Sequence, residues 1–264
     1  MTEISGLPPA VALEYRLRDC RNVVSLGVKP NFTDYTPAER TLIKRAGKIY
    51  YPSSFYADLF DAMGKKTFPS YHTYKCVQDK IKQTALFELT GIPYPRTRVF
   101  YGPRQQADIR NHFEFPFVAK VPRGSAMGRG VFLIAGENGL DDYLAHCRPA
   151  YIQEYLPIDR DIRLVVIGHR VVHAYWRVAP PGDFRTNVSV GGTISLDPVP
   201  QAAMDLALDV CRRCGWDDVG IDICRYRGKY FVLEANMKYG KEGFRAAGID
   251  YNLLMERMIE DGEI

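Results

Sequence analysis

Residues 221–236 read IDICRYRGKYFVLEAN and combine a β-hairpin pattern with three oxygen-bearing side chains. A three-residue loop over 227–229, with a glycine at its centre, is a common way to join two such strands. In that register Asp222 lies opposite Glu234, and strand alternation puts Asn236 on the same face as Glu234. The pattern therefore predicts that three oxygen donors converge at one end of the hairpin.

The two carboxylates of this hairpin favour a divalent cation. Burying adjacent carboxylates is costly unless a positive charge compensates them. Mg²⁺ prefers a few carboxylate ligands together with phosphate oxygens and water. From the hairpin alone, two interpretations fit the sequence equally. One is a metal–nucleotide site, and the other is a register shifted by one residue, which would turn the acids toward water.

A glycine-rich segment upstream of the hairpin offers contacts for phosphate groups. Strand patterns over 115–121 and 130–135 flank the loop sequence PRGSAMGRG, whose glycines would let backbone N–H groups approach an anion closely. The loop has neither the Walker A nor the GxGxxG spacing, so alone it is better explained as a flexible hairpin loop. Together with Lys120, Arg185 and Asn187 it predicts a polyphosphate-binding cradle.

The composition of the 264 residues is typical of a globular protein, with 46% hydrophobic residues, 25% charged residues and a formal net charge of +4. This small positive excess fits an anionic ligand but gives no argument for nucleic acid. There is no apolar run of about 20 residues, and the first residues lack the pattern of a secretion signal. We therefore expect a cytoplasmic protein with neither nucleic acid nor a membrane as its partner.

Six cysteines are scattered along the chain, and the CRRC sequence over 211–214 has a spacing typical of metal ligands. A structural zinc site needs four ligands, of which this pair supplies two. The pair also lies in a predicted helix that ends at Gly215. We expect the cysteines to be packing residues in a reducing compartment.

Strand and helix patterns mix along the chain without strict βαβ alternation, which predicts an α+β fold rather than one doubly wound sheet. One helix is predicted over 78–91 and ends at a glycine. Ile81, Ala85, Leu86 and Leu89 share one face of this helix, a pattern typical of a face that packs on a core.

Five motifs occur in the order and close to the spacings of the ATP-grasp superfamily, and the chain resembles its RimK-like ligases in particular. The motifs are DKIKQTALFELTGIPYPRT at 79–97, FVAKVPRGSAMGRGV at 117–131, QEYLPIDRDIRLVVIG at 153–168, DFRTNVSVGG at 183–192 and VGIDICRYRGKYFVLEAN at 219–236. RimK-like ligases add amino acids to a carboxylate of a protein or a small molecule. The resemblance covers roughly residues 76–260 and is more specific for fold and nucleotide than for substrate.

The resemblance implies an ATP-grasp fold, in which two α+β lobes grip ATP. We expect a short N-terminal lobe over 1–75 that precedes an ATP-grasp domain over 76–264. Within that domain, 76–150 would form the first lobe with the glycine-rich loop, and 151–264 would form the second lobe with the metal site.

The resemblance also assigns roles to individual residues. Two lysines, a glycine-rich lid, a strand at the adenine, a ribose acid and two phosphate-site residues would bind the nucleotide. The two lysines are Lys80 and Lys120, and the lid residues are Gly124, Ser125, Gly128 and Gly130. The strand at the adenine comprises Gln153, Glu154, Tyr155 and Leu156. Asp161 is the ribose acid, and Arg185 and Asn187 are the phosphate-site residues. Asp222, Glu234 and Asn236 would hold Mg²⁺. Catalytic roles fall to Arg185, Lys120 and Arg177, the last as a clamp on the substrate carboxylate.

The activity implied by the resemblance is that of an ATP-dependent carboxylate–amine ligase, in which an amine attacks an acyl phosphate made with ATP. Its cofactors would be ATP and Mg²⁺, with Mn²⁺ as an alternative metal. Its partners would be a small-molecule or protein-borne carboxylate and an amino-acid-like amine. Two alternatives stay open, an ATP-grasp phosphotransferase and a nucleotide-binding regulatory protein without turnover. The sequence also leaves the oligomeric state open, a homo-oligomer included.

Two segments depart from the family pattern. After the metal-site asparagine, relatives commonly read close to NSSPGLEG, whereas this chain reads NMKYGKEG with Met237, Lys238 and Tyr239. Since this stretch borders the acceptor site in the family, Lys238 and Lys241 favour a more anionic or differently shaped substrate, unless Lys238 is a solvent-exposed loop residue. The Tyr- and Phe-rich segment within 50–75 could line a substrate wall or pack between lobes.

Overall fold

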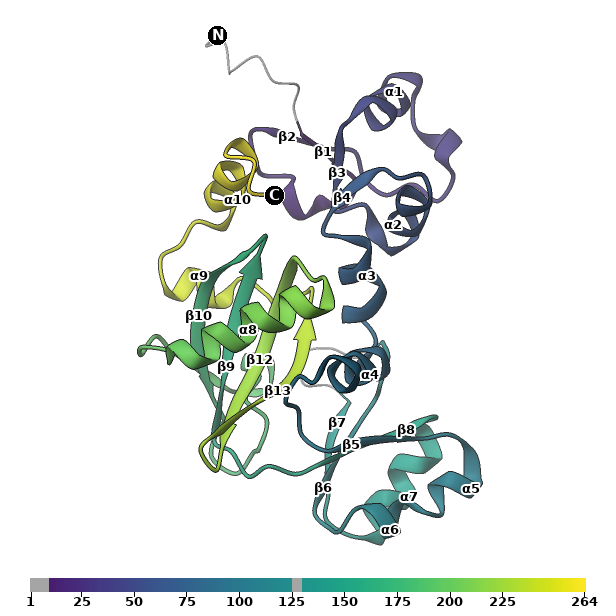
Figure 1. Cartoon of the computed structure of the whole chain (residues 1–264), viewed down its shortest axis with the longest axis vertical. Helices are drawn as coiled ribbons and strands as arrows, with labels where there is room; N and C mark the ends of the chain where they lie inside the picture. The colour runs from purple at the N-terminus through teal and green to yellow at the C-terminus, as the bar shows by residue number, and fades with distance from the viewer. Residues whose placement is uncertain (1–9, 125–129) are drawn as a thin grey trace.

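The computed structural model describes residues 10–124 and 130–264, and this part of the chain folds around three β-sheets that follow one another in sequence (Figure 1). Helices and strands mix throughout, so the predicted α+β class is confirmed. None of the helices in these ranges is long and apolar enough to cross a membrane.

The N-terminal sheet is a short parallel sheet in the order β2-β1-β3-β4. Its strands are β1 (Ala10–Ala12), β2 (Val23–Ser25), β3 (Lys48–Tyr50) and β4 (Lys66–Phe68), and its helical elements are η1 (Tyr15–Leu17), η2 (Phe32–Asp34), α1 (Pro37–Arg45) and α2 (Ser53–Ala62). Helix α1 begins at a capping box, in which Thr36 and Glu39 each accept a hydrogen bond from the other's backbone N–H. Helices α1 and α2 provide the crossovers that parallel strands require.

The second sheet is antiparallel, in the order β5-β8-β6-β7. Its strands are β5 (Thr97–Phe100), β6 (Phe117–Lys120), β7 (Val131–Ile134) and β8 (Ala150–Glu154); helices α3 (Tyr71–Val77) and α4 (Lys80–Thr90) precede it, and α5 (Gly102–Gln106), α6 (Ile109–His112) and α7 (Glu137–His146) connect its strands. Strands β6 and β7 are the two strands predicted on either side of the glycine-rich loop. Their core includes Phe117, Leu140 and Ile152.

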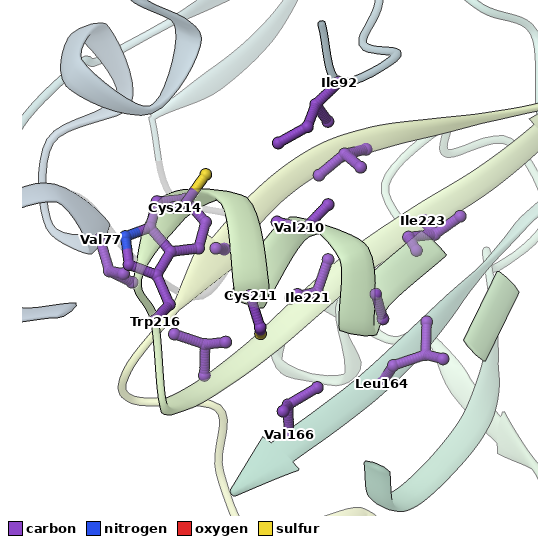
Figure 2. Packing of buried hydrophobic residues seen from close by; sticks show 14 of the residues in the cluster. Val77, Ile92, Leu164, Val166, Val210, Cys211, Cys214, Trp216, Ile221 and Ile223 are labelled. Carbon is purple, nitrogen blue, oxygen red and sulfur yellow. The ribbon is translucent and has the colours of Figure 1, made fainter. Parts of the chain in front are cut away.

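The third sheet is also antiparallel, in the order β11-β10-β9-β12-β13. Its strands are β9 (Arg160–Ile167), β10 (Arg170–Val178), β11 (Thr193–Ser195), β12 (Asp218–Tyr226) and β13 (Lys229–Asn236), and the helical elements that follow β10 are η3 (Val188–Val190), α8 (Gln201–Cys214), α9 (Glu242–Ala246) and α10 (Tyr251–Glu260). Helix α8 packs on one face, where Figure 2 shows Val210 close to Ile221 and Ile223. Because alternate residues of a strand face opposite sides, Asp222 points to the other face of the sheet.

The β12–β13 hairpin has the predicted pairing but not the predicted turn. Asp222 lies opposite Glu234, as expected, yet the turn has two residues rather than three, because Tyr226 pairs with Lys229. Both turn residues have positive φ, which a tight two-residue turn requires. A β-bulge beside Asp222 then shifts the register by one residue and restores the pairing that a three-residue loop would have produced.

Helix α4 turns a different face to the core than the sequence predicted. Phe87 and the polar Gln83 are buried, whereas Leu89 is 82% exposed. Gln83 exchanges hydrogen bonds with the backbone of Ala235 at 3.0 and 2.8 Å and donates to the carbonyl oxygen of Val77 at 2.6 Å. These partners satisfy the buried amide, so Gln83 ties α4 to β13 beside the predicted metal ligands.

Aromatic contacts join the N-terminal sheet to the end of the chain. In Figure 1 helix α10 lies beside β1 and β2, and the Tyr50 hydroxyl donates a hydrogen bond of 2.9 Å to the carbonyl oxygen of Ile264. Tyr51 and Phe68 are buried in the same cluster as residues of α10. Tyr50, Tyr51 and Phe68 therefore pack between parts of the chain, which is one of the two roles considered for the aromatic segment 50–75.

The six cysteines lie in the described residues and carry free thiols. Cys211 and Cys214 are buried at the end of α8, near Trp216, as Figure 2 shows. Burial raises the pKa of the Cys214 thiol to about 12, so this group stays protonated at neutral pH. The CRRC pair therefore belongs to the core, as predicted.

Candidate active site

A cavity where the second and third sheets meet collects most of the residues predicted to bind the nucleotide. Its walls come from β6, β7 and β8, from β9, β10, β12 and β13, and from residues 184–187. The predicted residues that line it are Lys120, Gln153, Glu154, Tyr155, Leu156, Asp161, Arg177, Arg185, Asn187, Asp222 and Glu234. We call this space the nucleotide cavity.

The nucleotide cavity has apolar as well as polar lining residues, a feature that the sequence did not predict, and we call the apolar ones together the apolar slot. Its apolar lining residues are Pro95, Val118, Val131, Leu156, Ile158, Phe184 and Leu233. An apolar slot with a few polar groups around it is a usual environment for a bound aromatic ring system. Because residues 153–156 line the same cavity, their predicted place beside adenine is compatible with this slot.

Glu234 lies among positive charges. Lys80 Nζ is 3.5 Å from Glu234 Oε2, and the Asn236 amide donates a hydrogen bond of 2.8 Å to Glu234 Oε1. Burial alone would raise the pKa of Glu234, but the charges of Lys80 and Lys120 and the hydrogen bond from Asn236 lower it to about 2. Glu234 is therefore ionised at neutral pH and can bind a cation.

Lys120, at the end of β6, is deeply buried for a lysine, with 6% of its surface exposed. Burial and the nearby charge of Lys80 lower the pKa of its ammonium group, while the charge of Glu234 opposes that shift. A charge in such a low-dielectric setting attracts an anion more strongly than a hydrated one. Lys120 lines the nucleotide cavity, and Lys80 lines a small neighbouring pocket together with Glu234, so both lysines lie where they could attract phosphate groups.

Four buried charged residues form an ion-pair ladder across the third sheet, in the order Asp161, Arg177, Asp222 and Arg163. Arg177 donates from Nε to Asp161 Oδ1 at 2.8 Å and pairs with Asp222 through Nη2 at 2.9 Å. Arg163 binds both oxygens of Asp222 through Nε and Nη2. Two positive and two negative charges compensate each other, which makes their burial tolerable.

The ion-pair ladder engages two residues that have predicted roles in substrate binding, Asp161 and Arg177. Asp161 also accepts a hydrogen bond of 2.7 Å from the Thr186 hydroxyl, so its carboxylate is engaged by two partners. Arg177 binds two carboxylates of the chain itself. Both residues line the nucleotide cavity, and the ribose contact of Asp161 and the substrate clamp of Arg177 stay predictions.

Asp222 lies opposite Glu234 in the register that the sequence predicted, with Asn236 two residues further along the strand, and the two oxygens of Asp222 are engaged by Arg163 and Arg177. Across residues 10–124 and 130–264, no group of three His, Cys, Asp or Glu side chains could hold a metal by itself. The trio supplies two carboxylates and one amide, and Mg²⁺ commonly completes such a partial set with phosphate oxygens and water. The donor set therefore fits Mg²⁺ bound together with a nucleotide.

Arg185 and Asn187 lie on the segment between β10 and η3. The Arg185 guanidinium pairs with Asp183 at 2.6 Å, and both Arg185 and Asn187 line the nucleotide cavity. Gly192 allows this segment to pack closely, because a Cβ at this position would lie 2.2 Å from the Thr186 carbonyl oxygen. Glycine is thus needed at 192 to hold the segment in place.

Both ends of the glycine-rich loop are described, and they lie together. The Val121 N–H donates a hydrogen bond of 2.8 Å to the Gly130 carbonyl oxygen. Gly124 and Gly130 have φ of 70° and 75°, a region that favours glycine. Neither is among the described residues that line the nucleotide cavity. The other predicted lid residues, Ser125 and Gly128, lie outside the described residues.

A second cavity shares a wall with the nucleotide cavity, and we call it the second cavity. Arg177, Asn187 and Glu234 line both spaces. The other residues of the second cavity are Arg163, Tyr175, Val188, Ser189, Asn236, Lys238, Tyr239, Gly240 and Glu242. The segment that departs from the family pattern therefore borders a space next to the predicted metal ligands.

The sequence reasoning gave no role in the site to three buried polar residues that shape it: Gln83, Arg163 and Thr186. For Arg163 a signal was present, since it stands two residues after Asp161 in a strand pattern and so shares its face. For Thr186 the signal was its place between Arg185 and Asn187. Gln83 gave no signal, because a polar residue in an amphipathic helix is normally exposed.

The fold is that of an ATP-grasp protein, and the chain belongs to the RimK-like ATP-grasp family. The sequence model of the RimK-like ATP-grasp domain matches residues 77–259. The family resemblance and the fold predicted from the motifs are thereby confirmed.

Individual relatives give further detail. The ribosomal protein bS6–L-glutamate ligase of Escherichia fergusonii is 32% identical over 191 residues, which cover 69% of this chain. The match spans 63% of that relative, less than two thirds of its length.

Two solved structures show likeness of fold. The RimK domain ATP-grasp protein of Sphaerobacter thermophilus has a TM-score of 0.71 at 17% identity, covering 94% of this chain and 98% of its own. The ATP-grasp ligase PsnB, in complex with a phosphomimetic precursor variant, Mg and ADP, has a TM-score of 0.62 at 21% identity, covering 81% of this chain and 79% of its own.

Proposed function

We propose that this protein is an ATP- and Mg²⁺-dependent ligase that joins a carboxylate to an amine through an acyl phosphate. The observation that carries the proposal is the grouping of Lys80, Lys120 and Glu234 beside an apolar slot. Phosphoryl transfer depends mainly on charge neutralisation and positioning, which this grouping can supply. Membership of the RimK-like family and the ligase names of the relatives support the same activity.

The chain's own residues would orient the nucleotide. The apolar slot would receive adenine, and Lys80 and Lys120 would attract the phosphates. Asp222, Glu234 and Asn236 would hold Mg²⁺, which when bound neutralises charge on the phosphate oxygens. The apolar lining residues would favour the adenine and the two lysines the phosphates, which would set the direction of the nucleotide.

The proposed reaction has two balanced steps. A carboxylate oxygen attacks the γ-phosphorus of ATP and the bond to the β–γ bridging oxygen breaks, which yields an acyl phosphate and ADP. The amine nitrogen then attacks the acyl carbon and loses a proton, and phosphate leaves with the electrons of the C–O bond. Arg185 would stabilise the transferring phosphate, and Arg177 would bind the substrate carboxylate.

The substrates are proposed by chemical class. They are an amino-acid-like amine and a carboxylate that is either a small molecule or borne by a protein, as the name of the bS6–L-glutamate ligase suggests by analogy. The second cavity is the proposed place for the carboxylate substrate, because it adjoins the nucleotide cavity at Arg177 and Glu234. An N-terminal lobe over 1–75, a cytoplasmic location and use of Mn²⁺ in place of Mg²⁺ belong to the same proposal.

Release of ADP tests the proposal. The protein is supplied with ATP, Mg²⁺ and a panel of carboxylates and amines, singly and in pairs. Release that needs both partners supports a ligase, whereas release with a carboxylate alone would indicate a phosphotransferase. Nucleotide binding without release for any pair would indicate a regulatory protein. Glu234→Gln is the control, since release from this site should fall to background in that variant.

A further inference from the structure

Arg163 is a buried arginine that lines the second cavity and binds Asp222, which lines the nucleotide cavity. It lies on β9 with 5% of its surface exposed and binds both oxygens of Asp222 through Nε and Nη2. Its third nitrogen, Nη1, donates a hydrogen bond of 3.1 Å to the Tyr239 carbonyl oxygen. One guanidinium thus joins a predicted metal ligand to the segment 237–241, part of which lines the second cavity.

The segment 237–241 packs closely onto β12 at this point. A Cβ at Gly220 would lie 2.4 Å from Tyr239 Cβ and 3.0 Å from Arg163 Cδ. Gly220 stands two residues before Asp222, so the two residues share a face of β12. Tyr239 and Arg163 therefore occupy the space that a side chain at position 220 would need.

The side chain of Tyr239 is held from elsewhere. Its hydroxyl donates a hydrogen bond of 2.7 Å to Asp218 Oδ1, and the Arg16 guanidinium lies 4.5 Å from the centre of its ring. These contacts anchor the tyrosine to the core and to the N-terminal part of the chain. Arg163 instead holds its carbonyl group, and so links the backbone of this segment to the site.

We propose that Arg163 is a positioning residue that holds Asp222 and the segment 237–241 in a defined relation to each other. It would thereby keep Asp222 in place for a metal-bound nucleotide and keep one wall of the second cavity in place for the carboxylate substrate. Loss of Arg163 leaves the ion-pair ladder with one positive and two negative charges, which disfavours its present geometry. This inference rests on the proposed function of the site.

Two substitutions and a matched control test the proposal. Arg163→Gln removes the charge, and Arg163→Lys keeps the charge but cannot bind both Asp222 oxygens and the Tyr239 carbonyl together. Arg170→Gln removes another arginine–carboxylate pair, with Glu263, which is exposed and lies outside both cavities. Thermal unfolding establishes which variants fold, and Arg163→Lys decides the test if Arg163→Gln does not fold.

Hydrogen exchange and ADP binding are then measured for each folded variant. We expect the backbone amides of 237–241 to exchange at least about tenfold faster in the Arg163 variants, and at an unchanged rate in Arg170→Gln. We also expect Mg²⁺ to tighten ADP binding at least about tenfold less in the Arg163 variants, the scale of a lost hydrogen bond between charged groups. In Arg163→Lys, which keeps the charge, binding of ADP without Mg²⁺ should change by less than that factor.

Unaltered exchange at 237–241 in a folded Arg163 variant would overturn the proposal, and so would an unaltered effect of Mg²⁺ on ADP binding. Faster exchange spread evenly over the chain would assign Arg163 a general structural role and overturn it as well. If the wild-type chain does not bind ADP with or without Mg²⁺, the proposed function fails. The exchange rates still decide in that case whether Arg163 holds the segment 237–241.

Discussion

Asp222 and Glu234 lie opposite each other across the β12–β13 hairpin, yet different cations balance the two carboxylates. Asp222 pairs with Arg163 and Arg177, whereas Glu234 faces Lys80 at 3.5 Å. Like charges can share one end of a hairpin because each has its own counter-charge. The guanidinium groups fix Asp222 in place, so Glu234 is the carboxylate whose replacement tests the metal site most simply.

Replacing Glu234 by glutamine should abolish Mg²⁺-dependent ADP release while the fold is kept. The amide has nearly the same shape but no negative charge for the cation, so we expect a loss of about 10²-fold or more in kcat. Steady-state kinetics measures the loss, and circular dichroism with thermal unfolding checks the fold. Full activity in a folded variant would remove Glu234 from the metal site.

Replacing Lys120 by alanine should weaken nucleotide binding. The substitution removes a desolvated positive charge from the cavity, and we expect about a tenfold or greater rise in the Kd for ADP, the scale of one hydrogen bond to a charged group. Calorimetry measures this affinity. Lys82→Ala on the exposed side of α4 is the matched control and should bind ADP like the wild type. Equal affinity in Lys120→Ala would contradict the phosphate role of Lys120.

Binding of ADP should take up protons at alkaline pH. Burial lowers the pKa of Lys120 in the free protein, and bound phosphate would favour the charged form and raise that pKa again. Below the lowered pKa the group is already charged and no uptake is expected, whereas uptake appears as the pH rises through it. Calorimetry in two buffers of different ionisation enthalpy measures this uptake. Uptake that persists unchanged in Lys120→Ala would assign it to another group.

Gly192→Ala should lower both stability and nucleotide affinity. The added Cβ would meet the Thr186 carbonyl oxygen at 2.2 Å, so the backbone must move. We expect a loss of about 1–3 kcal/mol in the free energy of unfolding, measured with denaturant. ADP binding should weaken because Thr186 holds Asp161 at the cavity. Gly47→Ala is the control, because an added Cβ at this position meets nothing within 4 Å. Equal effects of both substitutions would show that close packing at Gly192 does not hold the segment in place.

Strand alternation predicts on which face of a strand each motif residue lies. The hairpin pairing could be predicted in this way, but the turn and the bulge that produce it could not. The pairing of Asp222 with Glu234 was predicted from a three-residue loop, but it arises from a two-residue turn and a β-bulge. The shorter turn and the bulge shift the register by one residue in opposite directions, so Asp222 still pairs with Glu234. A bulge depends on neighbouring strands, so the local sequence could not reveal it.

Features that depend on contacts between distant segments could not be predicted. The face of α4 was wrong because Gln83 finds hydrogen-bond partners on β13, which makes a polar residue stable in the core. The ion-pair ladder needs Arg163, Arg177 and Asp222 from three strands, and only the tertiary arrangement brings their side chains together. The apolar slot likewise combines residues from both antiparallel sheets.

A crystal structure of the protein with ADP and Mg²⁺ would show whether the nucleotide and the metal occupy this site. We expect the adenine in the apolar slot, the phosphates beside Lys80 and Lys120, and a metal ion bound through Glu234, Asn236 and Asp222. Nucleotide density elsewhere on the molecule, with these three side chains away from any metal, would rule out this nucleotide site.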